Sequence, residues 1–132
     1  DIVELVEKLE LENTILIGHS VSSIIIGLAS ILKPELFQNL IMICPSPYYI
    51  NDGNYIGGFE QKDIDGLIET VNSNYLGWAS AITPVIIGNK EKTEFAEELT
   101  NSFCRNDPKI AKHFAEVTFK GDYRNILEQI NV

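Results

Sequence analysis

Residues 14–22 read TILIGHSVS, and this stretch decides the fold of the chain. Residues 14–17 are a short, largely apolar and partly β-branched run, which is typical of a parallel strand buried on both faces. From residue 21 to 33 apolar residues are dense and small ones are interleaved, which predicts a helix pressed closely against a sheet. Pro34 cannot continue that helix. The chain is therefore expected to turn sharply from strand to helix around Ser20.

This turn is the setting that a nucleophile elbow requires, with Ser20 in a strained backbone conformation and its hydroxyl exposed above the sheet. Gly18 lets strand and helix pass closely, and Ser22 stands where the usual GxSxG pattern has its second glycine. The backbone N–H of Val21 would lie at a helix start, where unpaired donors and the helix dipole favour negative charge. It would then form half of an oxyanion hole. The alternative is that Ser20 is an ordinary N-cap residue.

A catalytic serine also needs a base, commonly a histidine that a carboxylate orients. His19 adjoins Ser20 and is interpreted as a pocket wall or a contact at the strand end, and His113 as a solvated residue on a helix face. Because the chain order with this motif is serine, acid, histidine, we expect both missing groups beyond Val132. Asp52 lies in the loop after a strand and Asp107 is expected to cap a helix, so structural roles suffice for both. None of the following aspartates is assigned as the missing acid: Asp52, Asp63, Asp65, Asp107 and Asp122.

The segments on either side extend this pattern. Residues 2–11 have the spacing of an amphipathic surface helix, and residues 40–44 repeat the signature of a buried strand. Strand, helix and strand in this order predict parallel strands with a right-handed crossover. After a loop rich in Gly and Asn the chain reads as helical, with helices expected at residues 61–71, 75–87, 93–106, 108–119 and, shorter, 123–130.

These elements predict an α/β fold, with a partial parallel sheet of about two strands and a group of helices outside it. The expected domains are a partial core with the serine turn at residues 1–47, a helical cap at 48–122 and a return to the core at 123–132. Two parallel strands alone leave the backbone N–H and C=O groups at their outer edges without hydrogen-bond partners. We therefore expect that both ends of the chain are cut.

Composition and charge argue against several classes of protein. Hydrophobic residues make up 45% of the chain and charged residues 22%, an ordinary globular balance. The formal net charge of -9 repels nucleic acid and anionic lipid alike, so neither is an expected partner. The longest apolar stretch, residues 24–32, is much shorter than the roughly 20 residues that span a bilayer. No basic leader is visible at the N-terminus, so we expect a cytoplasmic protein that does not bind membranes.

The two cysteines, Cys44 and Cys104, show no metal-ligand spacing with either histidine. Buried free thiols are the preferred interpretation, and a disulfide or a zinc site is the less favoured one. We expect neither a metal nor a cofactor.

Several short stretches, in order along nearly the whole chain, carry a resemblance to a known family. They are residues 18–22 (GHSVS), 28–30 (LAS), 34–37 (PELF), 46–47 (SP), 49–52 (YIND), 57–60 (GGFE), 74–75 (NY) and 78–79 (WA). They resemble the branch of the α/β-hydrolases that contains the bacterial RsbQ-type stress-response regulators and the plant karrikin and strigolactone receptor hydrolases. Serine in place of the second glycine is a familiar variant in this branch.

The resemblance implies a lid of four helices, arranged as a V over an apolar pocket, and residues 61–119 would form it. An apolar, aromatic-lined pocket with a few polar groups beside a nucleophile suits a small hydrophobic ester or lactone. For each aromatic residue, plain core packing is the alternative. The pocket walls that the resemblance implies are His19, Tyr49, Phe59, Leu67, Trp78, Ile82, Leu99 and Phe119.

The leading hypothesis is a serine hydrolase, in which Ser20 attacks the carbonyl of a small apolar ester or lactone and the Val21 N–H holds the oxyanion. It concerns the whole protein, since residues 1–132 without the acid and the base should show negligible turnover. A second hypothesis is a ligand-sensing signalling module, whose cap binds a small hydrophobic ligand and a partner protein with little catalysis. A third is a structural piece without activity.

Overall fold

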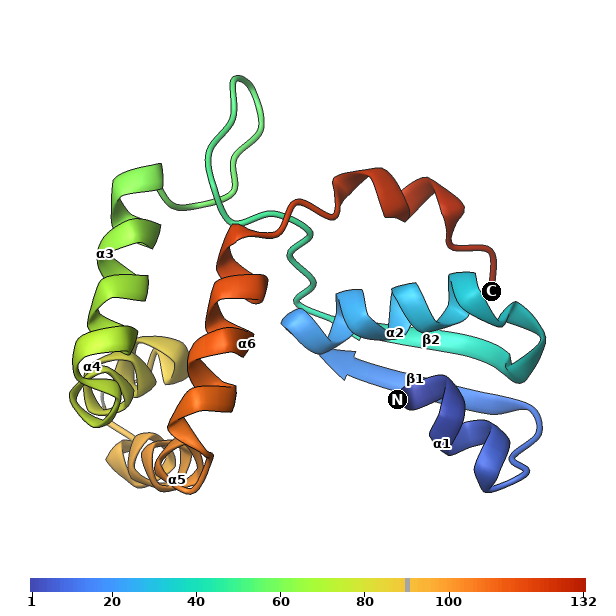
Figure 1. The fold of residues 1–132 in the computed structure, drawn as a ribbon, viewed down its shortest axis with the longest axis horizontal. Helices are drawn as coiled ribbons and strands as arrows, with labels where there is room; N and C mark the ends of the chain where they lie inside the picture. The colour runs from blue at the N-terminus through green and yellow to red at the C-terminus, as the bar shows by residue number, and fades with distance from the viewer. Residues whose placement is uncertain (90) are drawn as a thin grey trace. The chain divides into compact units, whose positions relative to one another are not determined.

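Two neighbouring parallel strands form the sheet of the chain (Figure 1). The computed structural model describes residues 1–89 and 91–132. Strand β1 (Thr14–His19) is joined to β2 (Phe37–Ile43) by helix α2 (Val21–Leu32) and the short 3-10 helix η1 (Pro34–Leu36). The register pairs Ile17 of β1 with Ile41 of β2. The predicted parallel strand, helix, strand unit is therefore confirmed.

The chain divides into two compact units. The first consists of Asp1–Tyr49, Tyr55–Gly57 and Gly121–Val132, and the second of Ile50–Asn54 and Gly58–Lys120. Besides the strands, the first unit contains α1 (Ile2–Lys8), α2, η1 and the 3-10 helix η2 (Arg124–Gln129). The second contains α3 (Gln61–Ser73), α4 (Tyr75–Ile87), α5 (Thr93–Cys104) and α6 (Pro108–Lys120). The predicted fold class, a two-stranded parallel sheet with a group of four helices outside it, is confirmed.

Two glycines allow close contacts of helix α2, Gly18 with the end of β1 and Gly27 with the segment after η2. A Cβ on Gly18 of β1 would lie 2.6 Å from the carbonyl oxygen of Ser22, closer than real Cβ atoms approach. A Cβ on Gly27 of α2 would lie 2.9 Å from Cδ1 of Ile130, in the segment that follows η2. The predicted close approach of this helix to the sheet is confirmed.

The two faces of the sheet differ in burial. Leu16 of β1 packs against the core cluster of this unit, which consists of Val6, Ala29 and Phe37. Successive strand side chains point to opposite faces, and on the face opposite Leu16 four isoleucines are exposed: Ile15 (52%), Ile17 (65%), Ile41 (47%) and Ile43 (45%). The prediction that these strands are buried on both faces is wrong, because the helices among the described residues cover one face only.

The second unit has its own core. Helix α3 contacts α4 and α6, and α4 packs along α5 (Figure 1). Ile64 and Val71 of α3 and Ala79 of α4 are almost completely buried. Across the α4–α5 contact, the hydroxyls of Thr83 and Thr100 are hydrogen-bonded to each other. The helices predicted at residues 61–71, 75–87, 93–106 and 108–119 are confirmed, with ends that move by no more than a few residues.

Polar side chains satisfy the helix ends of this unit. Asp107 Oδ1 accepts the Lys109 N–H at the start of α6 at 2.8 Å, which confirms the predicted cap role of Asp107. At the start of α3, Glu60 and Asp63 form a capping box in which each side chain binds the backbone N–H of the other. These contacts explain why α3 and α6 begin where they do.

Elements of the first unit also have boundaries that differ from the sequence predictions. Helix α1 ends at Lys8, before residue 11, and β2 begins at Phe37, before residue 40. The last short helix is a 3-10 helix from Arg124 to Gln129. Runs of 3-10 helix are short because their hydrogen-bond geometry is poorer, which suits a connection of this length.

Both cysteines are free, but they are exposed. Cys44 directly follows β2, and Cys104 is the last residue of α5. The prediction of buried thiols is wrong, because both side chains lie at the ends of elements rather than in a core.

None of the described helices has both the length and the apolar character that a bilayer crossing needs. In residues 1–89 and 91–132, no three or more His, Cys, Asp and Glu side chains are grouped so that they could hold a metal ion.

Candidate active site

Ser20 lies at the turn between β1 and α2 and has a strained backbone. Its φ is 55° and its ψ is -124°, a combination that residues other than glycine rarely adopt. The Ser20 N–H donates to the Ile43 carbonyl at the end of β2 at 2.9 Å. The turn is thereby anchored to the neighbouring strand, and the sharp strand-to-helix turn predicted at this position is confirmed.

Neighbouring residues hold this turn in place. Ser23 Oγ donates to the Gly18 carbonyl at 2.8 Å and also lies 3.3 Å from the Ile43 carbonyl oxygen. The Ser23 side chain is fully buried, so it fastens the first turn of α2 to the ends of both strands. Ser22, in contrast, is exposed, which explains why a side chain fits where the usual motif has a glycine.

The hydroxyl of Ser20 does not serve as a helix cap. Ser20 occupies the N-cap position of α2, yet its side chain makes no capping hydrogen bond. Its Oγ lies 3.4 Å from the hydroxyl oxygen of Tyr49, at the long end of the hydrogen-bond range. Both residues are half-buried. The ordinary N-cap role is therefore not the one that this hydroxyl plays in the structure.

The backbone N–H of Val21 follows directly after Ser20. Val21 is the first residue of α2, where N–H groups have no acceptor within the helix. The positive end of the helix dipole adds to the attraction for a negative charge at this point. The arrangement suits an oxyanion beside Ser20, and that role of Val21 stays a prediction.

The two histidines lie in different units. His19 is the exposed last residue of β1, where Ile43 is its register partner. His113 is exposed on α6, as expected of a solvated residue. The interpretation that neither histidine is the base for Ser20 stays a prediction.

Six of the residues predicted to line a pocket lie in the second unit. Phe59 belongs to the loop before α3 and is 38% exposed. Trp78 of α4 is stacked between Tyr75, at 5.7 Å between ring centroids, and Phe103 of α5, at 5.6 Å. The remaining residues of this group are half-buried on α3 to α6: Leu67, Ile82, Leu99 and Phe119. Since His19 and Tyr49 belong to the first unit, the pocket stays a prediction.

Most of the aspartates have structural partners. Asp63 and Asp107 cap helices, and Asp65 accepts a hydrogen bond from Gln61 Nε2 at 3.0 Å within α3. Asp122 binds the side chain of Arg124. These contacts account for the four carboxylates without a catalytic role.

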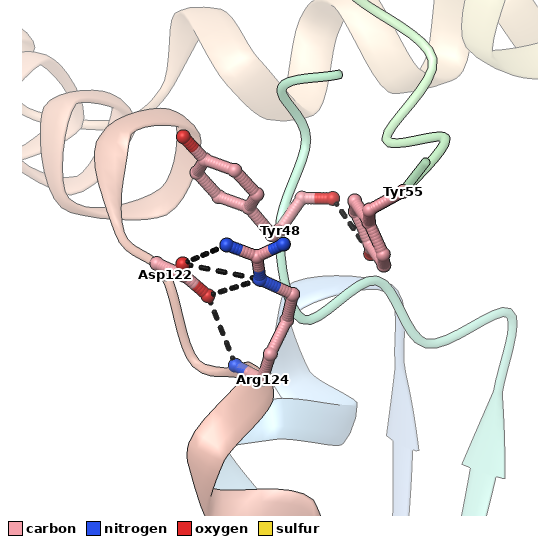
Figure 2. Close-up of polar contacts among 4 residues, drawn as sticks. All are labelled: Tyr48, Tyr55, Asp122 and Arg124. Atoms are coloured by element: carbon pink, nitrogen blue, oxygen red, sulfur yellow. Dashed lines mark hydrogen bonds and ion pairs between the residues drawn. The ribbon is translucent and has the colours of Figure 1, made fainter. Parts of the chain in front are cut away.

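The sequence interpretation missed a polar cluster in the first unit. Figure 2 shows Arg124 beside the rings of Tyr48 and Tyr55, with its guanidinium bound to Asp122. The pair Asp122 and Arg124, two residues apart after the last helix of the second unit, was the only signal in the sequence. Neither tyrosine could be connected with this pair before the chain was folded.

The contact with Arg124 favours the charged form of Asp122. The hydrogen bonds from the Arg124 side chain lower the pKa of Asp122 below its usual 3.8. At neutral pH the carboxylate and the guanidinium are both charged, as these groups ordinarily are.

Comparison with known proteins finds relatives along the whole chain. No protein-family model matches it. A probable esterase of Oryza sativa subsp. japonica and the karrikin insensitive 2 receptor CA of Petunia hybrida are each 36% identical over 132 residues, which is 100% of this chain and 49% of each relative. A strigolactone esterase of Pisum sativum is 35% identical over 133 residues and is covered to 49%. The chain thus spans about half the length of the curated relatives it matches.

Solved structures of other proteins share the fold of this chain. A hydrolase from Oleispira antarctica superimposes with a TM-score of 0.91 at 43% sequence identity, over 98% of this chain and 48% of that one. An esterase from Exiguobacterium antarcticum has a TM-score of 0.90 at 19% identity, over 100% of this chain and 50% of that one, and supports the fold alone.

Proposed function

We propose, from the premise that this chain is part of an α/β-hydrolase fold homologous to the karrikin and strigolactone receptor esterases, that Ser20 is the nucleophile of a serine hydrolase. The observation that carries the proposal is the backbone of Ser20, whose φ of 55° at the strand-to-helix turn frees the hydroxyl from capping. A strained residue at such a turn is what a nucleophile elbow requires. The names of two relatives, a probable esterase and a strigolactone esterase, support the same class of chemistry.

The proposed reaction begins when Ser20 Oγ attacks the carbonyl carbon of the substrate and a base takes the hydroxyl proton. The Val21 N–H donates to the carbonyl oxygen as it becomes negative. Collapse of the tetrahedral intermediate expels the alcohol, which takes up that proton, and water then hydrolyses the acyl-serine. We propose no residue of this chain as the acid or the histidine, and residues 1–132 alone are expected to show negligible turnover.

We propose a small apolar ester or lactone as the substrate. The support is the apolar and aromatic character of the second unit's candidate residues, together with the Tyr49 hydroxyl beside Ser20 as a polar contact. We propose that the eight candidate residues line the pocket for this substrate. A cytoplasmic location is proposed as well.

The test is turnover of a p-nitrophenyl ester of a short acid by the whole protein and its Ser20→Ala variant. We expect the variant to lose at least about a thousandfold in kcat, since the nucleophile acts in every turnover. Ser22→Ala is the matched control, because Ser22 is exposed two residues away, and it should retain most of the activity. Equal turnover by the Ser20→Ala variant would reject the proposal.

The second candidate function is a ligand-sensing signalling module of the RsbQ-like kind, with a partner protein and little catalysis. The word receptor in the name of the Petunia hybrida relative favours it. Isothermal titration of a small apolar lactone separates the two candidates. Binding by both the parent protein and Ser20→Ala, without serine-dependent turnover, favours the sensor.

A further inference from the structure

The cluster in Figure 2 connects three separate segments of the first unit. Tyr48 lies in the segment after β2, Tyr55 in the short stretch 55–57, and Arg124 in the segment after α6. The guanidinium carbon of Arg124 is 4.6 Å from the ring centroid of Tyr48 and 4.8 Å from that of Tyr55. The two ring centroids are 6.1 Å apart, so the three planar groups all contact one another. Attraction of a cation to aromatic faces favours this arrangement.

Asp122 sets the orientation of the guanidinium. Arg124 Nε donates to Asp122 Oδ1 at 2.9 Å and lies 3.1 Å from Oδ2, and Nη2 donates to Oδ2 at 2.6 Å. A two-point contact of this kind fixes the plane of the guanidinium as well as its position. Between these residues, Tyr123 donates its backbone N–H to the Pro47 carbonyl at 2.8 Å. The segment is therefore held against the chain that leaves β2.

The cluster also holds the peptide that leads into Tyr49. The carbonyl of Tyr48 accepts hydrogen bonds from the Tyr55 hydroxyl at 3.1 Å and from Ser46 Oγ at 3.2 Å. Because a peptide group is planar, this carbonyl fixes the direction in which the chain enters Tyr49. The Tyr55 hydroxyl thus helps to orient the peptide from which the Tyr49 side chain extends.

We propose that Arg124 is a positioning residue for Tyr49. It acts through the two tyrosine rings that it contacts, and it keeps the Tyr49 hydroxyl 3.4 Å from Ser20 Oγ. The inference rests on the proposed function, in which Ser20 is the nucleophile. It adds that the polar group beside the nucleophile is placed by a segment that follows the second unit in the chain.

The first test does not depend on catalysis. The whole protein is prepared with ¹³C at Cζ of its tyrosines, and the Tyr49 resonance is assigned by its loss in Tyr49→Phe. In Arg124→Gln we expect this resonance to shift and broaden, because the Tyr49 ring samples other positions. Arg105→Gln is the matched control, since Arg105 is exposed at the end of α5 in the second unit, and it should leave the resonance in place.

A milder pair of variants covers the case in which Arg124→Gln fails to fold. Tyr55→Phe removes the hydroxyl that binds the Tyr48 carbonyl, and it should shift the Tyr49 resonance in the same direction. Tyr75→Phe removes a similar bond, to the Phe103 carbonyl at 3.0 Å, in the second unit and should not. An unmoved Tyr49 resonance in folded Arg124→Gln, or in Tyr55→Phe if the former misfolds, overturns the inference.

The kinetic test asks whether Arg124 acts through Tyr49. We expect Arg124→Gln to lower the serine-dependent kcat/KM about tenfold, less than the roughly hundredfold loss that a 1 Å misplacement in an active site can cause. In a Tyr49→Phe background the same change should have almost no further effect. Equal losses in both backgrounds contradict a role through Tyr49. Turnover that does not depend on Ser20 rejects the proposed function instead, while the Tyr49 resonance still decides the positioning role.

Discussion

Gly18 and Ser20 show how single residues shape the proposed site. Gly18 has no space for a side chain, and Ser20 has a backbone conformation that few residues adopt. Ser23 fastens both through its bonds to carbonyls at the strand ends. The sequence GHS at residues 18–20 predicted the close contact at Gly18 and the sharp turn at Ser20 correctly, because both arise within a few consecutive residues. Arg124 could not be predicted in the same way, since its aromatic partners lie about seventy or more residues earlier and depend on tertiary structure.

We predict that Gly18→Ala destabilises the first unit. The added Cβ would lie 2.6 Å from the Ser22 carbonyl oxygen, so backbone has to shift, at a cost of about 1–3 kcal/mol in the free energy of unfolding. Gly66→Ala is the control, because a Cβ there meets nothing within 4 Å, and alanine should stabilise α3 by about 0.5–1 kcal/mol. Urea denaturation measures both values. Similar values for the two variants would contradict the packing explanation.

Among the elements, the helices of the second unit were predictable because each has a local signal. Asn74 caps α4 by accepting the Gly77 N–H at 3.0 Å, and Asp107 does the same for α6. Such caps and an apolar stripe lie within one helix, so the sequence contains them. The 3-10 character of η2 and the early start of β2 at Phe37 were missed, because they depend on contacts with other elements.

We predict that Asn74→Ala lowers the stability of the second unit by about 1 kcal/mol, the usual value for the loss of an N-cap. The first turn of α4 would be left with an unsatisfied N–H. Asn72→Ala is the matched control, since Asn72 is exposed inside α3 and its carbonyl, which Lys112 Nζ binds, is kept. Thermal unfolding followed by circular dichroism should show a lower Tm for Asn74→Ala only. The same Tm for both variants would mean that the cap contributes nothing.

At the scale of the whole molecule, each unit has its own core. Ile64 is fully buried in the second unit, and Ile24 is 2% exposed in the first. Helix periodicity predicted which stretches belong to the helical unit, while the exposure of the sheet isoleucines was predicted wrongly. Burial on a second face requires a second layer, and a strand's own sequence does not contain that layer.

We predict that Ile64→Ala opens the second unit more than the first. Truncation of a buried isoleucine costs about 2–5 kcal/mol, and the loss falls on the core that surrounds it. Hydrogen exchange should rise mainly in residues 58–120, while Ile24→Ala should raise it mainly in residues 1–49. A uniform rise in both variants would show that the two cores unfold as one cooperative unit.

The sequence by itself determined the parallel strand, helix, strand order, the strained turn at Ser20 and the helices that follow, because each depends on short-range patterns. Only the tertiary structure decided which face of the sheet is covered, that the Ser20 hydroxyl faces Tyr49, and that Arg124 joins Tyr48 and Tyr55. The physical reason is the distance along the chain over which each effect acts. Backbone preference and periodicity act over a few residues, whereas burial and side-chain contacts arise when distant segments meet.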